Sequence, residues 1–160
     1  MKKIAFASFM GLALAMSMVS MARADADPPK AWQDVRALVV RFNDAQNAHN
    51  LDVIGALLVN SPDFVWAVGP TVQHGRDAAL GQLAAMYQAA NWSVLPDYGA
   101  LNIQLLGDDQ ADVTLPTQFK ATTPLQDTTM QAVVHERAIK TSEGWRLSAV
   151  AVQPQPAAAF

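Results

Sequence analysis

The sequence contains no cysteine among its 160 residues. This absence excludes disulfide bonds, thiolate metal ligands, a cysteine nucleophile and an acylated lipoprotein anchor. Positive charge is also scarce, because 11 Lys and Arg residues stand against 14 Asp and Glu residues. Nucleic acids are bound through concentrated basic surfaces, so we expect no nucleic-acid partner. The length is typical of one domain, with at most one processed segment.

Several sequence motifs that are typical of particular enzyme classes are missing as well. The sequence has no Gly-x-Ser-x-Gly elbow, no phosphate-binding glycine loop and no dinucleotide fingerprint, which argues against serine hydrolases, NTPases and nicotinamide enzymes. Its three histidines lie in separate predicted elements without His-x₃-His spacing. The run from Asp108 to Asp112 lacks the glycine and the final glutamate of a calcium loop. We therefore expect neither a metal nor a cofactor.

The amino terminus has the pattern of an export signal. Lys2 and Lys3 precede an uncharged apolar run at 4–19, and Ala22-Arg23-Ala24 fits the small-x-small rule of signal peptidase. The run is shorter than the roughly 20 residues of a membrane-spanning helix. The pattern predicts a signal peptide over residues 1–24, cleavage after Ala24, and a periplasmic or secreted protein of bacterial type with no membrane contact after cleavage.

Removal of the signal would change the character of the chain. It leaves eight basic residues against fourteen acidic ones, a net charge of −6. We expect one domain over residues 25–153, followed by a flexible tail over residues 154–160 that is rich in proline and alanine.

Hydrophobic periodicity predicts an α+β fold. Apolar residues at helical spacing indicate a first helix up to about residue 49, a short second helix over 51–59 and a third helix after Gly75. Alternating or β-branched segments predict strands at 64–68, 71–74, 101–105, 111–119, 128–140 and 145–152. This order favours three helices packed on a mostly antiparallel sheet, whose last four strands form a meander.

Three segments resemble the nuclear-transport-factor-2-like (NTF2-like) superfamily. Residues 41–52 resemble its first helix and the following junction, residues 74–80 the "G-x-x-A-I/L" start of its third helix, and residues 144–147 its "GW+I" strand opening. The SnoaL-like or DUF4440-type branch is the most similar. The resemblance implies a cone formed by three helices and a curved sheet, a central pocket, and homodimers that pack through their sheets. It implies no single activity, because the superfamily includes isomerases, hydrolases, cyclases and binding domains.

The resemblance also argues against one established chemistry of the superfamily. The position that matches the tyrosine of ketosteroid isomerases is Phe42, and the position that matches their catalytic aspartate is Trp66. Neither side chain transfers protons at neutral pH, so isomerase chemistry of that design is not expected. Positions that carry histidines in the last strand of other relatives match Ala149 and Ala151, which predicts an apolar wall there.

Two groups of residues are candidates for a site. The aromatic residues Phe42, Trp66, Tyr87 and Trp92 are predicted to line a pocket for a flat or apolar ligand, although such residues are often ordinary core.

His135 and Arg137 lie two apart on a predicted strand and share one face, with Glu136 on the other. They are candidates for acid–base catalysis and anion binding in the pocket. The alternative is that this face is a dimer interface, or that it pairs with Asp112.

Three functions follow from these candidates. The first is an exported domain that binds a small apolar or aromatic molecule in its central pocket, without a catalytic set. The second is a SnoaL-like isomerase, cyclase or hydrolase that uses His135 and Arg137. The third is a protein-interaction module that uses the sheet face.

Overall fold

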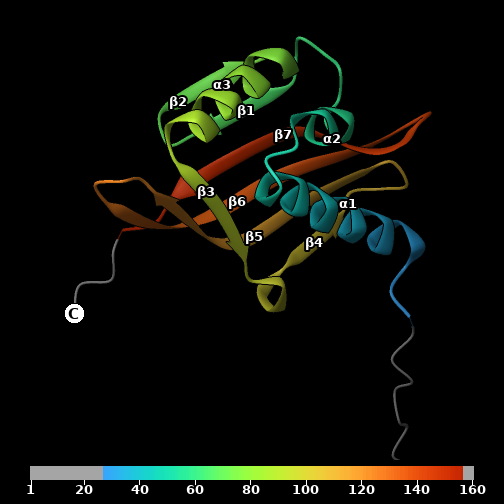
Figure 1. Cartoon of the computed structure of the whole chain (residues 1–160). Coiled ribbons are helices and arrows are strands. Elements are labelled where there is room, and N and C mark those ends of the chain that lie inside the picture. Colours follow the sequence, from blue (N-terminus) through green and yellow to red (C-terminus); the bar gives the residue numbers. More distant parts are fainter. Residues whose placement is uncertain (1–26, 157–160) are drawn as a thin grey trace, which may run out of the picture.

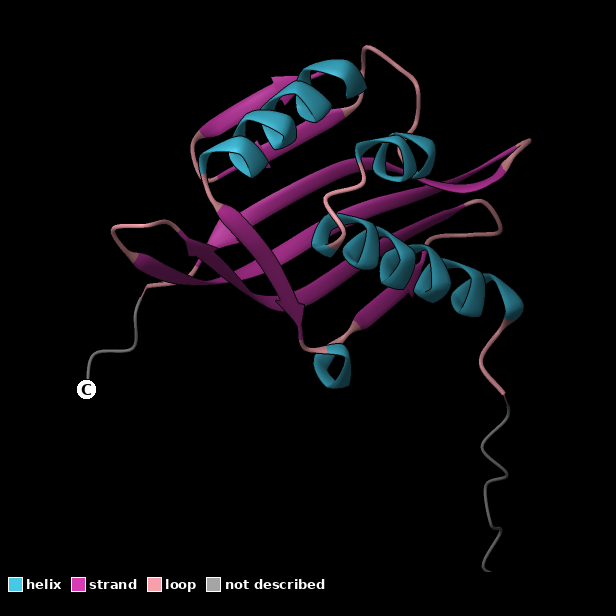
Figure 2. Ribbon diagram, in the orientation of Figure 1, coloured by secondary structure: helices cyan, strands magenta, loops and turns pink. Residues whose placement is uncertain are grey.

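The computed structural model describes residues 27–156. The predicted signal peptide and residues 157–160 lie outside this range. The chain forms one seven-stranded sheet with three α-helices on one of its faces, as Figure 1 and Figure 2 show. Between residues 27 and 156, none of the helices is both long enough and apolar enough to cross a membrane.

The helices and strands alternate in an order that the sequence predicts only in part. The helices are α1 (Lys30–Asn47), α2 (Leu51–Leu57), α3 (Arg76–Ala89) and the short 3₁₀ helix η1 (Tyr98–Ala100). The strands are β1 (Val65–Val68), β2 (Thr71–His74), β3 (Asn91–Pro96), β4 (Asn102–Leu105), β5 (Gln110–Thr122), β6 (Asp127–Thr141) and β7 (Gly144–Pro154).

The sheet is mostly antiparallel, as expected, with one parallel pair. Its order is β2-β1-β7-β6-β5-β3, and β4 pairs with β5 next to β3. The parallel pair joins β1 to β7, so the first hairpin extends the sheet beyond the last strand. The α+β prediction is therefore confirmed, and the third helix follows the first hairpin, as the position of Gly75 predicts.

The predicted meander of the last four strands is confirmed, because β4 pairs with β5, β5 with β6 and β6 with β7, but the prediction misses β3. This strand pairs with residues 117–122 of β5, whereas β4 pairs with residues 111–114, so both lie along the same edge of β5. The sequence hides β3 because Asn91 and Pro96 bound a short segment in which Leu95 stays exposed. Its position matters, because Trp92 and Val94 belong to the site described below.

The last strand continues beyond its expected end. The prediction stops it at residue 152 and starts a loose tail at residue 154, but β7 extends to Pro154. The backbone N–H of Gln155 then donates to the carbonyl oxygen of Gln131 at 2.8 Å. Pro154 and Gln155 are thus held against β6.

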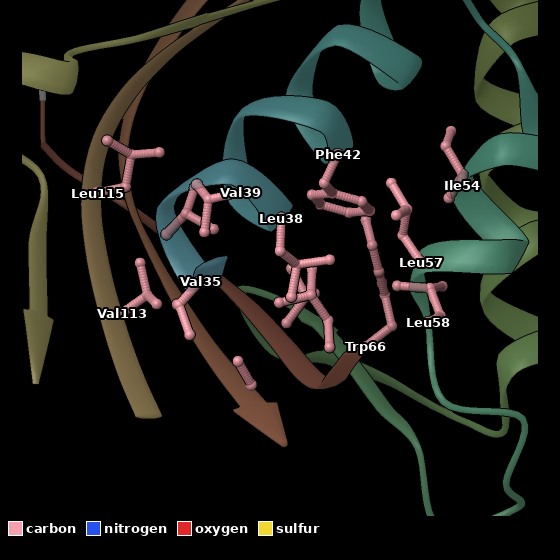
Figure 3. Packing of buried hydrophobic residues seen from close by; sticks show 14 of the residues in the cluster. Val35, Leu38, Val39, Phe42, Ile54, Leu57, Leu58, Trp66, Val113 and Leu115 are labelled. Atoms are coloured by element: carbon pink, nitrogen blue, oxygen red, sulfur yellow. The ribbon is translucent and has the colours of Figure 1, made fainter. Parts of the chain in front are cut away.

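The core lies between the helices and the inner face of the sheet (Figure 3). Val35 and Val39 of α1 lie near Val113 and Leu115 of β5, and all four are at most 1% exposed. The burial of such side chains is the main favourable contribution to folding. One sheet face therefore holds the domain together, and no helix of residues 27–156 lies over the other face (Figure 2).

Candidate functional site: an aromatic cavity inside the cone

The helices and the curved sheet enclose an apolar cavity of about 60 Å³. This is small beside the roughly 300–1,000 Å³ of pockets that take drug-sized ligands. The cavity is lined by side chains from α1, α3 and five strands: Phe42, Asn43, Gln46, Trp66, Val68, Leu83, Met86, Tyr87, Trp92, Val94, Phe119, Met130, Val134, Val150 and Val152.

The four aromatic residues selected from the sequence all lie on this wall. Phe42 comes from α1, Trp66 from β1, Tyr87 from α3 and Trp92 from β3. The rings of Phe42 and Trp66 meet edge to face, with centroids 6.3 Å apart and an interplanar angle of 64° (Figure 3). Elements far apart in the sequence therefore converge on one aromatic site.

The end of α1 positions two of these aromatic residues. His49 has a left-handed backbone conformation, with a φ of 52°. Its ring stacks on Tyr87 with centroids 4.2 Å apart, and its Nε2 lies 2.8 Å from the carbonyl oxygen of Trp92. The sequence suggests no role beyond the helix end for His49. The structure shows that it connects α3 to β3 at the cavity.

A second connection at this helix end holds β3 in place. The side-chain amide of Asn47 donates to the carbonyl oxygen of Val94 at 2.9 Å and accepts from its N–H at 2.7 Å. Asn47 thus bonds to both backbone groups of Val94, as a neighbouring strand would.

Polar atoms without partners lie among the apolar walls. The Nε1 of Trp66 and the Oη of Tyr87 are buried and have no hydrogen-bond partner in the described part of the chain. Burial raises the pKa of Tyr87 to about 12, so its hydroxyl stays protonated at neutral pH. The amides of Asn43 and Gln46 add further polar groups on α1. Within residues 27–156, no side chain that lines the cavity carries a charge.

One ionisable residue lies just beyond this wall. Glu136 is 4% exposed and pairs with Val150 of β7. Val150 lines the cavity, and so does Val134, which is the preceding inward-facing residue of β6. The Oε2 of Glu136 has no hydrogen-bond partner. Burial raises the pKa of Glu136 to about 8, because a carboxylate loses its hydration there. Glu136 is therefore mostly a neutral carboxylic acid at pH 7.

Tyr98 of η1 shares this polar region. Its hydroxyl is buried without a well-formed hydrogen bond. Burial raises the pKa of Tyr98, the charges of Asp44 and Glu136 raise it further, and Asn43 and Arg36 lower it. Asn43 lines the cavity and also acts on Tyr98, so it connects the cavity to this deeper polar group.

His135 and Arg137 do not reach the cavity. They share one face of β6, as their spacing predicts, but that face is the outer one. Arg137 forms a bidentate ion pair with Asp112 of β5, with Nε–Oδ1 and Nη2–Oδ2 distances of 2.8 and 3.1 Å. The interpretation that places both in the pocket is thus corrected. Strand alternation assigns residues to two faces but does not say which face the helices cover.

The same reasoning corrects the two alanines of the last strand. Ala149 and Ala151 pair with Arg137 and His135 and lie on the outer face with them. The residues of β7 that line the cavity are Val150 and Val152, so this wall is apolar through different residues from those expected.

Glu136 is not selected by residue type and spacing, which predict only that it points away from His135. The available signal is the inward-facing series of β6, in which Ala132, Val134 and Ala138 are apolar and Glu136 alone is ionisable. A single charge within a buried apolar series indicates a functional group or a perturbed pKa.

Comparisons with known proteins place the fold among NTF2-like structures. An NTF2-like superfamily protein from Salmonella enterica serovar Typhimurium is similar over 82% of this chain and 95% of its own, with a TM-score of 0.73 and 13% identity. A candidate dehydratase of the NTF2-like family from Streptomyces avermitilis covers 80% and 98%, with a TM-score of 0.70 and 16% identity. A candidate scytalone dehydratase from Novosphingobium aromaticivorans covers 78% and 84%, with a TM-score of 0.70 and 14% identity.

Comparison with protein-family models gives no match, and neither does comparison with curated proteins. The structural neighbours are less than 25% identical to this chain, so they define its fold alone. The chain has the NTF2-like fold that its three short segments indicate.

Proposed function

We propose that this protein binds a small apolar or aromatic molecule in the cavity of its cone. The observation that carries the proposal is the convergence of Phe42, Trp66, Tyr87 and Trp92 on one enclosed apolar space. Small-molecule sites have this composition, with apolar walls and a few polar groups. The present volume is below the roughly 150 Å³ of a cavity that binds benzene, so a ring ligand requires Met86 and Met130, which are flexible wall residues, to move aside.

A matched pair of substitutions on β6 tests this proposal. Val134 lines the cavity and Val133 lies on the opposite face. We expect Val134→Phe to fill the cavity and to abolish binding of toluene in an NMR titration, whereas Val133→Phe leaves the binding intact. Thermal unfolding checks that both variants fold, and Met86→Phe serves as a second filling variant. Equal toluene affinity in all four proteins, or none in the wild type, would overturn the proposal.

A dehydratase-like enzyme is a second candidate function. Its support is Glu136, a buried acid beside the cavity, together with the names of two structural neighbours. A base is the missing part, because no His, Asp or Glu lines the cavity within residues 27–156. Scytalone is a direct probe. Loss of water from scytalone in the presence of wild-type protein, and not of Glu136→Gln, would favour this second function. The binding proposal predicts no turnover by either protein.

The remaining expectations complete the proposal. The sequence supports a SnoaL-like or DUF4440-type domain that is exported to the periplasm through the signal at residues 1–24. The uncovered outer face of the sheet supports a homodimer or another protein partner (Figure 2). Native mass spectrometry of periplasmic protein tests export, mass after cleavage and oligomeric state together. Ala151→Glu, on the outer face, is expected to weaken a dimer of this kind.

A further inference from the structure

We propose that the ligand of the cavity is an uncharged single-ring compound carrying an acceptor oxygen, and that Trp66 Nε1 and Tyr87 Oη donate hydrogen bonds to it. This inference deepens the proposed function and rests on it. It assigns donor roles to two buried groups that have no partner among residues 27–156.

Trp66 provides the first unpaired donor. An indole N–H can only donate, so no rearrangement of its own turns it into an acceptor. Trp66 is 4% exposed and lines the cavity, yet its Nε1 has no partner. A buried donor that stays unpaired has lost its bond to water without a replacement. A ligand oxygen in the cavity supplies that replacement.

Tyr87 provides an independent second donor. The stack with His49 holds its ring, Tyr87 lines the same cavity, and its Oη is buried without a partner among residues 27–156. Because burial raises the pKa of Tyr87 to about 12, the hydroxyl keeps its proton and remains able to donate. Two unpaired donors on one cavity favour a ligand that accepts.

The charges near the cavity favour an uncharged ligand. No Lys, Arg or His within residues 27–156 lines the cavity, so an anion would be buried without a counter-ion. Glu136 lies beyond the wall and is mostly neutral at pH 7, so it offers little to a cation. The aromatic walls favour a ring compound. The volume of about 60 Å³ limits it to a single ring, which is admitted when the flexible side chains of Met86 and Met130 move aside.

Acetophenone and cumene form a matched probe pair for this inference. The two molecules have nearly the same shape, but only acetophenone has an acceptor oxygen. In NMR titrations of the whole protein, we expect acetophenone to move the Trp66 indole N–H signal downfield and cumene to leave it near its original shift. Trp66→Phe assigns that signal.

The variants separate hydrogen bonding from packing. Tyr87→Phe removes only the hydroxyl, and we expect it to weaken acetophenone binding by about three- to tenfold while cumene affinity is unchanged. Trp66→Phe should weaken acetophenone binding more than Trp92→Phe does, because both lose ring area but only Trp66 loses a buried unpaired donor. For cumene, the two tryptophan variants should lose similar affinity. Thermal unfolding confirms that each variant folds.

Three outcomes would overturn the inference. The first is equal weakening of both probes by Tyr87→Phe, which would show that the hydroxyl affects packing and not an acceptor. The second is binding of benzoate as tight as that of acetophenone. The third is tight binding of benzylamine that Glu136→Gln abolishes, which would assign an ion pair to Glu136. In each case cumene binding would leave the proposed function intact, whereas failure of every probe would overturn both.

Discussion

Three consecutive residues of β6 show how differently the two faces of this sheet treat ionisable groups. On the outer face, His135 and Arg137 are exposed, and Arg137 pairs with Asp112 in contact with water. On the inner face, Glu136 is 4% exposed and its Oε2 has no partner. From the sequence, His135 and Arg137 are the candidates for catalysis, but Glu136 is the residue whose pKa is strongly raised.

The physical reason is the cost of removing a charge from water. An exposed ion pair gains little, because water already stabilises both ions and salt screens their attraction. A carboxylate buried inside the cone loses its hydration, so its protonated form is favoured. Residue type and spacing do not distinguish the ionisable residues on the two faces of β6. Only their burial does.

The largest expected effect is the pH dependence that Glu136 imposes on stability. The pKa of Glu136 is about 8 in the folded protein and near its ordinary value of 4.5 in the unfolded chain. Between these values the folded state keeps a proton that the unfolded state has lost, so the free energy of unfolding falls as the pH rises. The fall amounts to about 5 kcal/mol from pH 4.5 to pH 8 and then stops.

Urea unfolding at a series of pH values measures this effect as the difference between wild type and Glu136→Gln. The glutamine variant lacks the titration and should become the more stable protein as pH rises. Arg137→Gln, on the outer face, serves as the control and should keep the wild-type slope. Parallel curves for wild type and Glu136→Gln would mean that Glu136 is not a buried neutral acid.

The same substitution at two leucines compares a buried position with an exposed one. Leu115 is 1% exposed on the inner face of β5, whereas Leu95 of β3 is 45% exposed. We expect Leu115→Ala to lower the free energy of unfolding by about 2–5 kcal/mol, because it leaves a cavity in the core. Leu95→Ala should cost less than about 1 kcal/mol. Chemical denaturation measures both, and similar losses would contradict the assignment of the core to one face.

Asn47→Ala tests how α1 holds the strand that carries Trp92. The substitution removes both hydrogen bonds to the backbone of Val94, and we expect a loss of about 1–2 kcal/mol. Hydrogen exchange at the Val94 amide should become faster than in a control with the exposed Gln88→Ala substitution. Unchanged protection of Val94 would show that the pairing with β5 alone holds β3.

The smallest effect is expected for the outer ion pair. Asp112→Ala removes the partner of Arg137, whose side chain is 53% exposed. We expect a loss below about 1 kcal/mol that becomes smaller in high salt, because the pair is screened. Thermal unfolding at low and high salt measures it. A loss as large as that of Leu115→Ala would indicate that this face is covered by a partner.

Much of the fold follows from patterns that the sequence displays openly. The helical spacing at the start of α1 and the Gly75 start of α3 each predict the element that is found. The alternation in β5 to β7 does the same for the long strands. β3 is missed because a short edge strand with an exposed leucine lacks a clear period, and only its pairing with β5 defines it.

The residues of the site also divide into those that the sequence predicts and those that it does not. The aromatic residues are predictable because bulky apolar side chains are driven inward wherever the chain places them. Glu136 and His49 are not predictable from their types. The role of His49 depends on a contact with Tyr87, and the state of Glu136 depends on the wall around it.

The sequence by itself determined the α+β class, the acidic composition and the aromatic residues of the cavity, because these depend on local periodicity and residue chemistry. The tertiary structure decided which face of β6 the helices cover, and therefore that Glu136 is inside while His135 and Arg137 are outside. It also decided that Trp66 Nε1 and Tyr87 Oη, on two residues that line one cavity, are buried without a hydrogen-bond partner among residues 27–156. The physical reason is that strand alternation is symmetric between two faces, and only packing between distant segments removes one of them from water.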